Sequence, residues 1–485
     1  MNRDLKPHAI FIAYPLQGHV NPSVHLARKL AENGFTITFI NTQYVHHKSS
    51  RARGNNNIDD DIFVDARKSG LDIRYATISD GLPLGFDRSL NHDQYMAALL
   101  HVFSAHAEEA VENILKSGEP VHCLIADTFF VWPAELAKKF GLLYVSYWTE
   151  TALVFSQYYH MDLLRKNSHY DCLDPRDEAI DYIPGVKSIE PKDLTSFLQA
   201  TDTTTVCHQI IHKAFEDVRG ADIVLCNSVY ELESDTISAL QPKIPFFAIG
   251  PVIPFGITKN IVPTSLWAES DCSQWLDTKP HGSVLYVSFG SYAHLTKNEL
   301  TEIANGLLDS NVSFVWVLRP DIVSSNDLDP LPVGFLDKMG DRGMIIKWCS
   351  QMHVLRHPAI GGFLSHCGWN SVMESMWSEL PLLCFPLYTD QFTNRKLVVD
   401  DWKIGINLCD RRVNVNKVEV SEKIKRLMDG NSSSKLRDNI KHLKKVLVGA
   451  LKSDGSSEKN VEQFISDVKV MISKKCQEKN GQETQ

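Results

Sequence analysis

The feature that most constrains the fold is an alternation of short apolar runs with helix-like segments. In the first half, apolar runs occupy 8–15, 35–42, 121–127, 142–148, 221–228 and 246–250. Such runs separated by helices are typical of a parallel sheet covered on both faces. A loop is expected over 16–21, then a helix over 23–33 with Pro22 in its first turn and Gly34 after its end. Another helix is expected near 131–140.

The second half of the chain repeats this plan. Its apolar runs lie at 283–291, 314–319, 344–349, 361–366 and 382–386, with helices expected near 296–310 and from about 369. Residues 250–270 contain three prolines and little periodicity, which indicates a linker. Since 485 residues exceed one ordinary core, the sequence predicts an α/β protein with domains at 1–250 and 276–460, a linker at 251–275 and a C-terminal helix with a frayed tail at 461–485.

Two polar segments carry separate expectations. Residues 434–476 are charged and helix-like, and the last nine residues are expected to fray. The stretch SSRARGNNNIDDD at 49–61 lacks an apolar face. Because a segment of this composition cannot bury enough apolar surface, a mobile loop is expected there.

Composition excludes several classes of protein. The net charge of −9 leaves no basic surplus for a nucleic-acid partner. No apolar run approaches the length of a membrane helix, and the first residues lack a signal-peptide core. Ten cysteines without a CxxC pair predict neither a disulfide framework nor a structural zinc site. We therefore expect a cytoplasmic protein, and a monomer.

Polar side chains gather where the predicted strands end. In open α/β sheets, ligands bind beyond the carboxyl ends of the strands. The residues at these ends are His19, Asp127, Thr149, Ser291, His366, Asn370, Ser371, Asp390 and Gln391. Because both halves contribute, the pattern predicts a cleft between two facing domains.

The segment GGFLSHCGWNSVMES at 361–375 joins a buried strand to a helix. A helix beginning near Trp369 leaves backbone N–H groups unpaired and places partial positive charge at its start, which suits a phosphate. Asn370, Ser371 and His366 would add hydrogen-bond donors. The alternative is that Asn370 or Ser371 only caps the helix, and this stretch alone leaves both interpretations open.

A longer pattern surrounds this segment. Residues 348–391 read WCSQMHVLRHPAIGGFLSHCGWNSVMESMWSELPLLCFPLYTDQ. They resemble the signature box of the plant secondary-product glycosyltransferases, which use UDP-sugars. The resemblance extends to GHVNP at 18–22, AD at 126–127, YWT at 147–149 and FGS at 289–291. It implies two facing Rossmann-like domains of GT-B type, with the acceptor held mostly by the first domain and the sugar nucleotide by the second.

The resemblance also implies a role for each matching residue. Trp348 would stack on uracil, Cys349 would offer its backbone, and Gln351 and Glu374 would bind the ribose. The diphosphate would be held by Ser291, His366, Asn370 and Ser371. The sugar would be contacted by Thr149, Trp369, Asp390 and Gln391. His19 would be the catalytic base, with Asp127 as its partner.

The chemistry of these residue types agrees with such roles. A hydroxyl acceptor must lose its proton during attack, and a neutral histidine with a pKa near ~6.5 suits that task. Asp127 could fix the imidazole tautomer and stabilise the imidazolium. Taken singly, each residue has a plainer interpretation: His19 a loop histidine bonded to backbone, Asp127 a helix cap, Trp348 a core residue, Glu374 a solvated helix residue.

Metal binding is not expected. The segments at 59–61 and 327–329 formally match the DxD element of metal-dependent glycosyltransferases, but both lie in polar segments. A zinc site could be composed from Cys349, His353, His357, His366 and Cys367, yet these residues have other ready roles or surface positions. We expect neither metal nor cofactor.

The expected activity is inverting transfer of a hexose, most simply glucose, from a UDP-sugar to a hydroxyl of a small phenolic or terpenoid acceptor, giving a β-glycoside. Two alternatives remain: a non-catalytic small-molecule binder with this fold, and a sugar-nucleotide epimerase or glycoside phosphorylase. The acceptor pocket is expected to include Phe86, Phe129, Phe130 and residues from 149–160 and 183–200.

Overall fold

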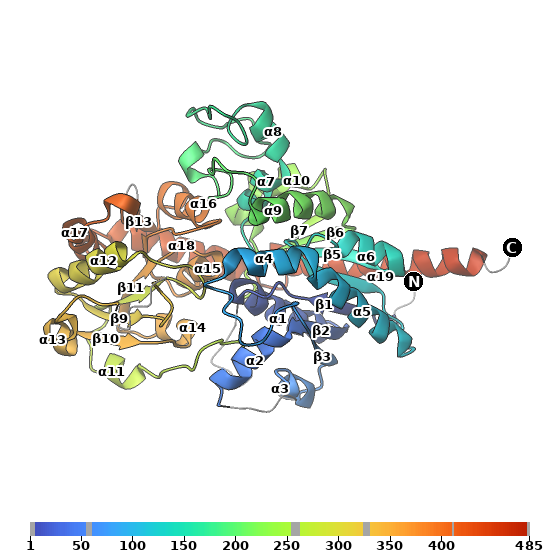
Figure 1. The fold of residues 1–485 in the computed structure, drawn as a ribbon, viewed down its shortest axis with the longest axis horizontal. Helices are drawn as coiled ribbons and strands as arrows, with labels where there is room; N and C mark the ends of the chain where they lie inside the picture. The colour runs from blue at the N-terminus through green and yellow to red at the C-terminus, as the bar shows by residue number, and fades with distance from the viewer. Residues whose placement is uncertain (1–4, 55–60, 254–261, 324–329, 410–411, 483–485) are drawn as a thin grey trace.

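The computed structural model describes residues 5–54, 61–253, 262–323, 330–409 and 412–482. Two lobes lie side by side, each built around one parallel sheet (Figure 1). Helices flank both sheets. The predicted α/β class with two Rossmann-like domains is confirmed.

The first lobe contains a seven-stranded sheet in the order β3-β2-β1-β4-β5-β6-β7, and neighbouring strands pair in parallel. Its strands are β1 (His8–Ile12), β2 (Thr36–Thr42), β3 (Ile73–Ile78), β4 (Cys123–Asp127), β5 (Leu143–Trp148), β6 (Ile223–Cys226) and β7 (Phe246–Ala248). Its helices are α1 (Gln17–Glu32), α2 (Gln43–Ala52), α3 (Val64–Lys68), α4 (His92–His101), α5 (Phe103–Lys116), α6 (Pro133–Phe140), α7 (Ala152–Tyr159), α8 (Met161–Lys166), α9 (Val206–Asp217) and α10 (Ser234–Leu240).

The second lobe contains a six-stranded parallel sheet in the order β10-β9-β8-β11-β12-β13. Its strands are β8 (Val284–Ser288), β9 (Ser313–Val317), β10 (Gly343–Ile346), β11 (Ile360–Ser365), β12 (Leu382–Cys384) and β13 (Gly405–Asn407). The helices that follow the first lobe are α11 (Ser273–Asp277), α12 (Lys297–Ser310), α13 (Phe335–Met339), α14 (Gln351–Leu355), α15 (Trp369–Trp377), α16 (Gln391–Lys396), α17 (Lys417–Met428), α18 (Ser434–Ala450) and α19 (Ser456–Gln482).

The strand order of each sheet contains one point at which the direction of winding reverses. In the first sheet the direction of winding reverses between β1 and β4, and in the second between β8 and β11. Ligands of open α/β sheets bind at such switch points, beyond the carboxyl ends of the strands. His19 and Asp127 flank the first switch point, whereas Ser291 and His366 flank the second.

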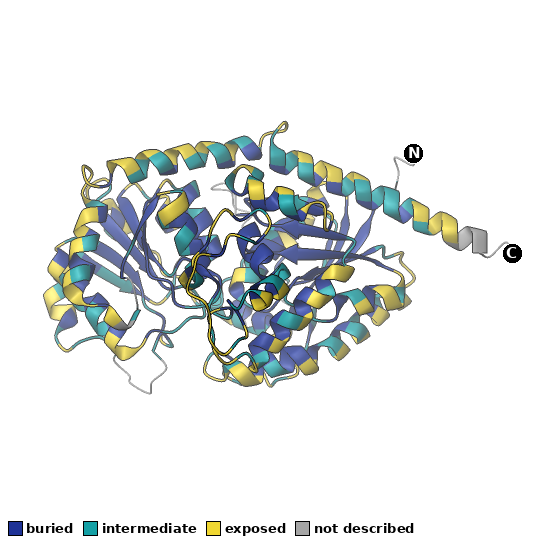
Figure 2. Ribbon diagram, turned by 90° about the horizontal axis from the view of Figure 1, so that it is seen from above, coloured by how far each residue is buried: buried dark blue, intermediate teal, exposed yellow. Residues whose placement is uncertain are grey.

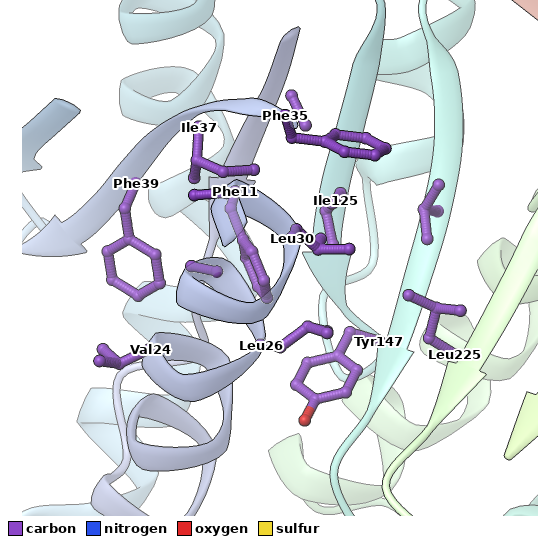
Figure 3. Close-up of a cluster of buried hydrophobic side chains, with 14 of the residues drawn as sticks. Phe11, Val24, Leu26, Leu30, Phe35, Ile37, Phe39, Ile125, Tyr147 and Leu225 are labelled. Atoms are coloured by element: carbon purple, nitrogen blue, oxygen red, sulfur yellow. The ribbon is translucent and has the colours of Figure 1, made fainter. Parts of the chain in front are cut away.

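The cores follow from the apolar runs. In the first lobe, Phe11 and Tyr147 meet edge to face with ring centroids 5.9 Å apart, and Leu26 and Leu30 of α1 pack in the same cluster (Figure 3). Both sheets are buried, while the outer faces of the helices are exposed (Figure 2). These layers fix the strand ends on which the cleft is built.

Several local expectations are wrong. Residues 17–22 form the start of α1 and not a loop, so Pro22 lies inside the helix. Residues 49–52 belong to α2, because Val45, His46, Ser49 and Ser50 form a buried face that composition alone does not reveal; residues 55–60 lie outside the described residues.

The C-terminal expectations have a mixed outcome. The charged segment is helical as expected and forms two helices, α18 and α19. Helix α19 continues through Gln482, so most of the residues expected to fray are helical, while 483–485 lie outside the described residues. In the part of the chain that is described, no helix is both long and apolar enough to cross a membrane.

Candidate active site

A cavity of about 740 Å³ lies between the two lobes and is lined by residues from both. All but one of the predicted site residues line it. They are His19, Thr149, Ser291, Trp348, Cys349, Gln351, His366, Trp369, Asn370, Ser371, Glu374, Asp390 and Gln391. Asp127 is buried directly against His19. The fold therefore brings together residues that are up to 372 positions apart, from His19 to Gln391.

His19 lies in the first turn of α1 and contacts two residues at the ends of β4 and β5. Its Nδ1 is 2.8 Å from Asp127 Oδ2 and 2.9 Å from Thr149 Oγ1. Asp127 is itself fixed, because its Oδ1 accepts a hydrogen bond from the Phe129 backbone N–H. A carboxylate beside Nδ1 favours the tautomer that carries its proton there. Nε2 makes no hydrogen bond within the described ranges, and its lone pair is then free to accept a proton.

Pro22 explains how α1 is joined to the second lobe. A proline has no N–H to donate to the carbonyl four residues earlier, which here belongs to Gly18. The Gly18 carbonyl instead accepts a hydrogen bond of 2.7 Å from Asn370 Nδ2, across the cleft. Two sequence segments, 18–22 and 366–371, thus meet through one bond that a missing backbone donor makes possible.

The start of α15 is the segment expected to bind an anion. Gly368 precedes the helix, and neither Asn370 nor Ser371 caps it with a side chain, so the cap interpretation is wrong. Burial lowers the pKa of His366 to about 3, with Arg319 as a further cause. His366 is therefore neutral and can serve a diphosphate only as a hydrogen-bond donor. A Cβ on Gly290 would lie 2.5 Å from His366 Nε2, which explains the glycine before Ser291.

The predicted ribose-binding residues contact one another. Gln351 Nε2 donates to Glu374 Oε2 at 2.7 Å and to Ser371 Oγ at 3.0 Å. Burial raises the pKa of Glu374 to about 7, so its carboxyl is partly protonated near neutral pH. Ribose hydroxyls can replace Gln351 as hydrogen-bond donors to this carboxylate. The half-buried Trp348 side chain lines the same end of the cavity.

Hydrogen bonds to neighbouring residues hold the predicted sugar-binding side chains in place. Gln391 Oε1 accepts hydrogen bonds from the backbone N–H groups of Leu387 and Tyr388, which leaves its amide NH₂ for the cavity. Asp390 accepts hydrogen bonds from Thr389 Oγ1 and Asn394 Nδ2. The indole N–H of Trp369 donates to the Asn227 carbonyl at 2.7 Å. Any sugar contact by Trp369 must therefore use another atom of that residue.

The acceptor end of the cavity is only partly as expected. Of the residues expected there, Phe129, Thr149, Glu150 and Phe197 line the cavity. Phe86 lines a neighbouring pocket of about 380 Å³, and Phe130 is a core residue that packs on Phe103 and Trp132. Sequence reasoning missed further lining residues, because they lie on helices and loops whose facing depends on tertiary packing: Tyr14, His92, Met96, Cys207, Ile210, Tyr292 and Tyr388.

The metal-like motifs have no assembled site in the described ranges. No group of three or more His, Cys, Asp or Glu side chains there is arranged to hold a metal ion. Asp61 forms an ion pair with Arg67 at 2.7 Å. The rest of the first DxD match, Asp59 and Asp60, and the whole of the second, 327–329, lie outside the described residues.

Solved structures share this architecture over nearly the whole chain. Os79 from O. sativa, solved with UDP, superposes with a TM-score of 0.81 at 27% identity, covering 95% of this chain and all of that one. A UGT2 structure from Phytolacca americana, solved with UDP-2-fluoro-glucose and pterostilbene, gives a TM-score of 0.76 at 26% identity, covering 96% of this chain and all of that one.

Sequence comparisons agree with the structural ones. A family model for UDP-glucuronosyl and UDP-glucosyl transferases matches residues 268–446. UDP-glycosyltransferase 86A2 from Arabidopsis thaliana is 60% identical over 460 residues, 94% of each chain. UDP-glycosyltransferase 86A1 from the same plant is 57% identical, covering 99% of this chain and 98% of the relative. With its cleft, its two switch points and these relatives, the chain belongs to the plant family 1 UDP-glycosyltransferases.

Proposed function

We propose that this enzyme transfers glucose from UDP-glucose to a hydroxyl of a small lipophilic acceptor, with inversion at the anomeric carbon and without a metal ion. The observation that carries the proposal is the state of His19. Its Nδ1 is held by Asp127 and Thr149, and its side chain lines the cavity between the two lobes. An imidazole held in this way is a base directed at whatever hydroxyl enters the cavity.

The proposed reaction is a single displacement. His19 Nε2 takes the proton of the acceptor hydroxyl while the oxygen attacks the anomeric carbon. The bond to the UDP oxygen breaks on the opposite face, so an α-linked donor sugar gives a β-glycoside. Asp127 stabilises the imidazolium that forms, because its carboxylate contacts Nδ1.

The leaving group meets preformed hydrogen-bond donors. Negative charge develops on the diphosphate as the bond to the sugar breaks. The start of α15 presents backbone N–H groups and partial positive charge there, with Ser291 and the neutral His366 beside it. Donors fixed before the reaction stabilise such charge without reorganisation, which is the reason no metal is included in the proposal.

The acceptor is proposed to be a phenolic or terpenoid molecule. The acceptor end of the cavity is lined by Tyr14, Phe129, Phe197, Tyr292 and Tyr388, and planar or ring-containing apolar molecules pack well on aromatic rings. The Phytolacca relative with pterostilbene in its structure supports a phenolic acceptor. Cytoplasmic location and a monomeric state stay predictions.

The product tests the proposal. Purified enzyme would be incubated with UDP-glucose and a library of hydroxylated metabolites, and the glycoside would be analysed by mass spectrometry and proton NMR. We expect a hexose adduct with the large anomeric coupling of a β-glucoside. An α-glucoside would contradict the single displacement. An isomerised nucleotide formed from UDP-glucose alone would favour an epimerase.

Metal removal tests the leaving-group account separately. We expect turnover in EDTA to equal turnover in untreated buffer, because fixed N–H donors neutralise the diphosphate. The measurement is the initial rate before chelation, after chelation, and after Mn²⁺ is added back. Loss of activity that Mn²⁺ restores would contradict the metal-free account and would direct attention to Asp59, Asp61, Asp327 and Asp329.

A further inference from the structure

Glu150 is a buried acidic residue in the cavity to which the proposed reaction gives no role. It follows Thr149 at the end of β5, lines the cavity and is 8% exposed. Within the described residues its carboxyl group makes no hydrogen bond, and Oε2 is fully buried without a partner. A buried polar atom without a partner destabilises a folded protein, so its presence at a cavity wall requires an explanation.

The surroundings favour the uncharged form of this carboxyl group. Burial raises the pKa of Glu150 well above its usual range, and the carboxylates of Asp390 and Asp127 raise it further. A protonated carboxyl has one O–H to donate and oxygen lone pairs to accept. Glu150 can therefore offer a neutral ligand both kinds of hydrogen bond.

The position of Glu150 favours the sugar over the acceptor as its ligand. The carboxylates of Asp390 and Asp127 lie close enough to Glu150 to raise its pKa, and Asp390 is a predicted sugar-binding residue. The backbone carbonyl of Glu150 accepts a hydrogen bond from Cys226 Sγ at 3.6 Å. Asn227, which follows Cys226, accepts a hydrogen bond from the Trp369 indole at its own carbonyl. Glu150 thus lies where the two lobes meet, near Thr149, Asp390 and Trp369.

We propose that Glu150 is a further specificity-determining residue, which hydrogen-bonds a hydroxyl of the sugar that is transferred. The proposal rests on the proposed function, in which a UDP-sugar occupies this cleft. It also favours a neutral donor sugar, because the carboxylate of a uronic acid would come near Asp127 and Asp390, the acidic neighbours of Glu150. An apolar side chain of equal length would fill the same space but could not form a hydrogen bond with the ligand.

Calorimetric binding of UDP-glucose and of UDP tests the proposal without an acceptor. Each variant's affinity for UDP serves as its own reference, so the ratio of the two affinities isolates the sugar. We expect Glu150→Met to lower this ratio about tenfold, the loss that follows when a sugar hydroxyl remains unpaired. Glu150→Gln, which keeps an uncharged polar group, should restore most of it.

Thermal stability separates a ligand-binding role from a structural one. Glu150→Met removes an unpartnered buried group, so we expect its Tm to equal or exceed that of the wild type while the affinity ratio falls. Glu233→Gln is the matched control: Glu233 is equally buried, but its carboxylate accepts from the Ala152 and Leu153 N–H groups. This control should lower Tm and leave the ratio within about twofold.

Three results would overturn the proposal. The first is an unchanged affinity ratio in Glu150→Met. The second is a change confined to the KM of the acceptor, which would place Glu150 against the acceptor. The third is a fall in the ratio that accompanies a fall in Tm, as expected of a structural residue. Failure of the proposed donor looks different, since the wild type would then bind UDP but not UDP-glucose.

Discussion

At the residue scale, burial decides which side chains in the cleft carry charge. His366 has a pKa of about 3 and is neutral, while the pKa of Glu374 is raised to about 7. Both shifts arise first from desolvation, which disfavours the charged form of either group. The sequence alone named both residues but could not indicate their protonation, because burial is a property of the folded chain.

Glu374 therefore predicts a pH dependence of donor binding. In the role predicted for Glu374, ribose hydroxyls would donate to its carboxylate, so the ionised form should bind better. Ionisation increases as pH rises through about 7, and we expect the affinity for UDP-glucose to rise about tenfold between roughly pH 5.5 and 8. Glu374→Gln should bind weakly and nearly independently of pH. Calorimetry at several pH values checks this, and an equal pH dependence in the variant would assign it to another group.

Gln391 predicts the choice of sugar. Its Oε1 is occupied by two backbone N–H groups and the residue lines the cavity, so its amide NH₂ is the group left to bind a ligand. Glucose and galactose differ in the direction of one hydroxyl. An unpaired polar group costs about 1–3 kcal/mol, so a preference for UDP-glucose of roughly ten- to a hundredfold is expected. Gln391→His should reduce this preference for UDP-glucose over UDP-galactose. The ratio of kcat/KM values for both donors measures this, and a wild type that prefers UDP-galactose would contradict the glucose assignment.

At the element scale, a segment of the first lobe supports the predicted sugar-binding residues. Ser196 N–H donates to the Thr389 carbonyl at 3.0 Å, and Thr389 N–H donates to Ser196 Oγ at 2.9 Å. Asp193 forms a buried ion pair with Arg395 of α16. The Ser196 contacts hold Thr389 ahead of α16 and the ion pair holds the last turn of this helix, so Asp390 and Gln391 lie between two fixed points.

Removing one partner of this buried pair leaves an uncompensated charge. We expect Arg395→Ala to lower the free energy of unfolding by about 3 kcal/mol and to raise the KM for UDP-glucose. Lys396→Ala is the control on the same helix, because Lys396 pairs with the more exposed Asp401 and should cost less than about 1 kcal/mol. Urea denaturation with donor kinetics measures both, and equal losses in the two variants would contradict the supporting role of the pair.

The elements also show how far a sequence can be interpreted. Apolar runs predict most strands, because a doubly covered strand must be apolar along its length. Strand β3 (Ile73–Ile78) was not predicted, since it lies at the edge of the sheet and its middle residues are half-buried. The start of α1 was misplaced because proline is common in the first turn of a helix. Here Pro22 lies further inside the helix, and the Gly18 carbonyl, to which Pro22 has no N–H to donate, accepts a hydrogen bond from Asn370 instead.

At the scale of the whole molecule, the last helix of the chain returns to pack on the first lobe. Helix α19 follows α18 but runs along the first lobe (Figure 2). There Phe464 stacks on Phe35, and Lys29 forms an ion pair with Glu458 at 2.6 Å. Sequence pattern predicts helices here but not the lobe that they cover. The acceptor pocket was likewise only partly predictable, because Tyr292 and Tyr388 come from the second lobe and enter it only when the lobes face one another.

The central claim concerns division of labour between the lobes: the first supplies the base and the second binds the nucleotide. His19 belongs to the first lobe, and the predicted nucleotide-binding residues belong to the second. A variant without the imidazole should therefore lose catalysis but keep its nucleotide. Asp127→Ala should lose less than His19→Ala, because Asp127 orients and stabilises the imidazole without taking the proton.

The rate of glucosyl transfer by His19→Ala, measured beside its affinity for UDP, tests this claim most directly. We predict a loss of transfer of about 10²–10⁴-fold or more, as expected for removal of a general base, with UDP affinity within a few-fold of the wild type. Transfer at the wild-type rate would contradict the account, because His19 would then have no part in the reaction.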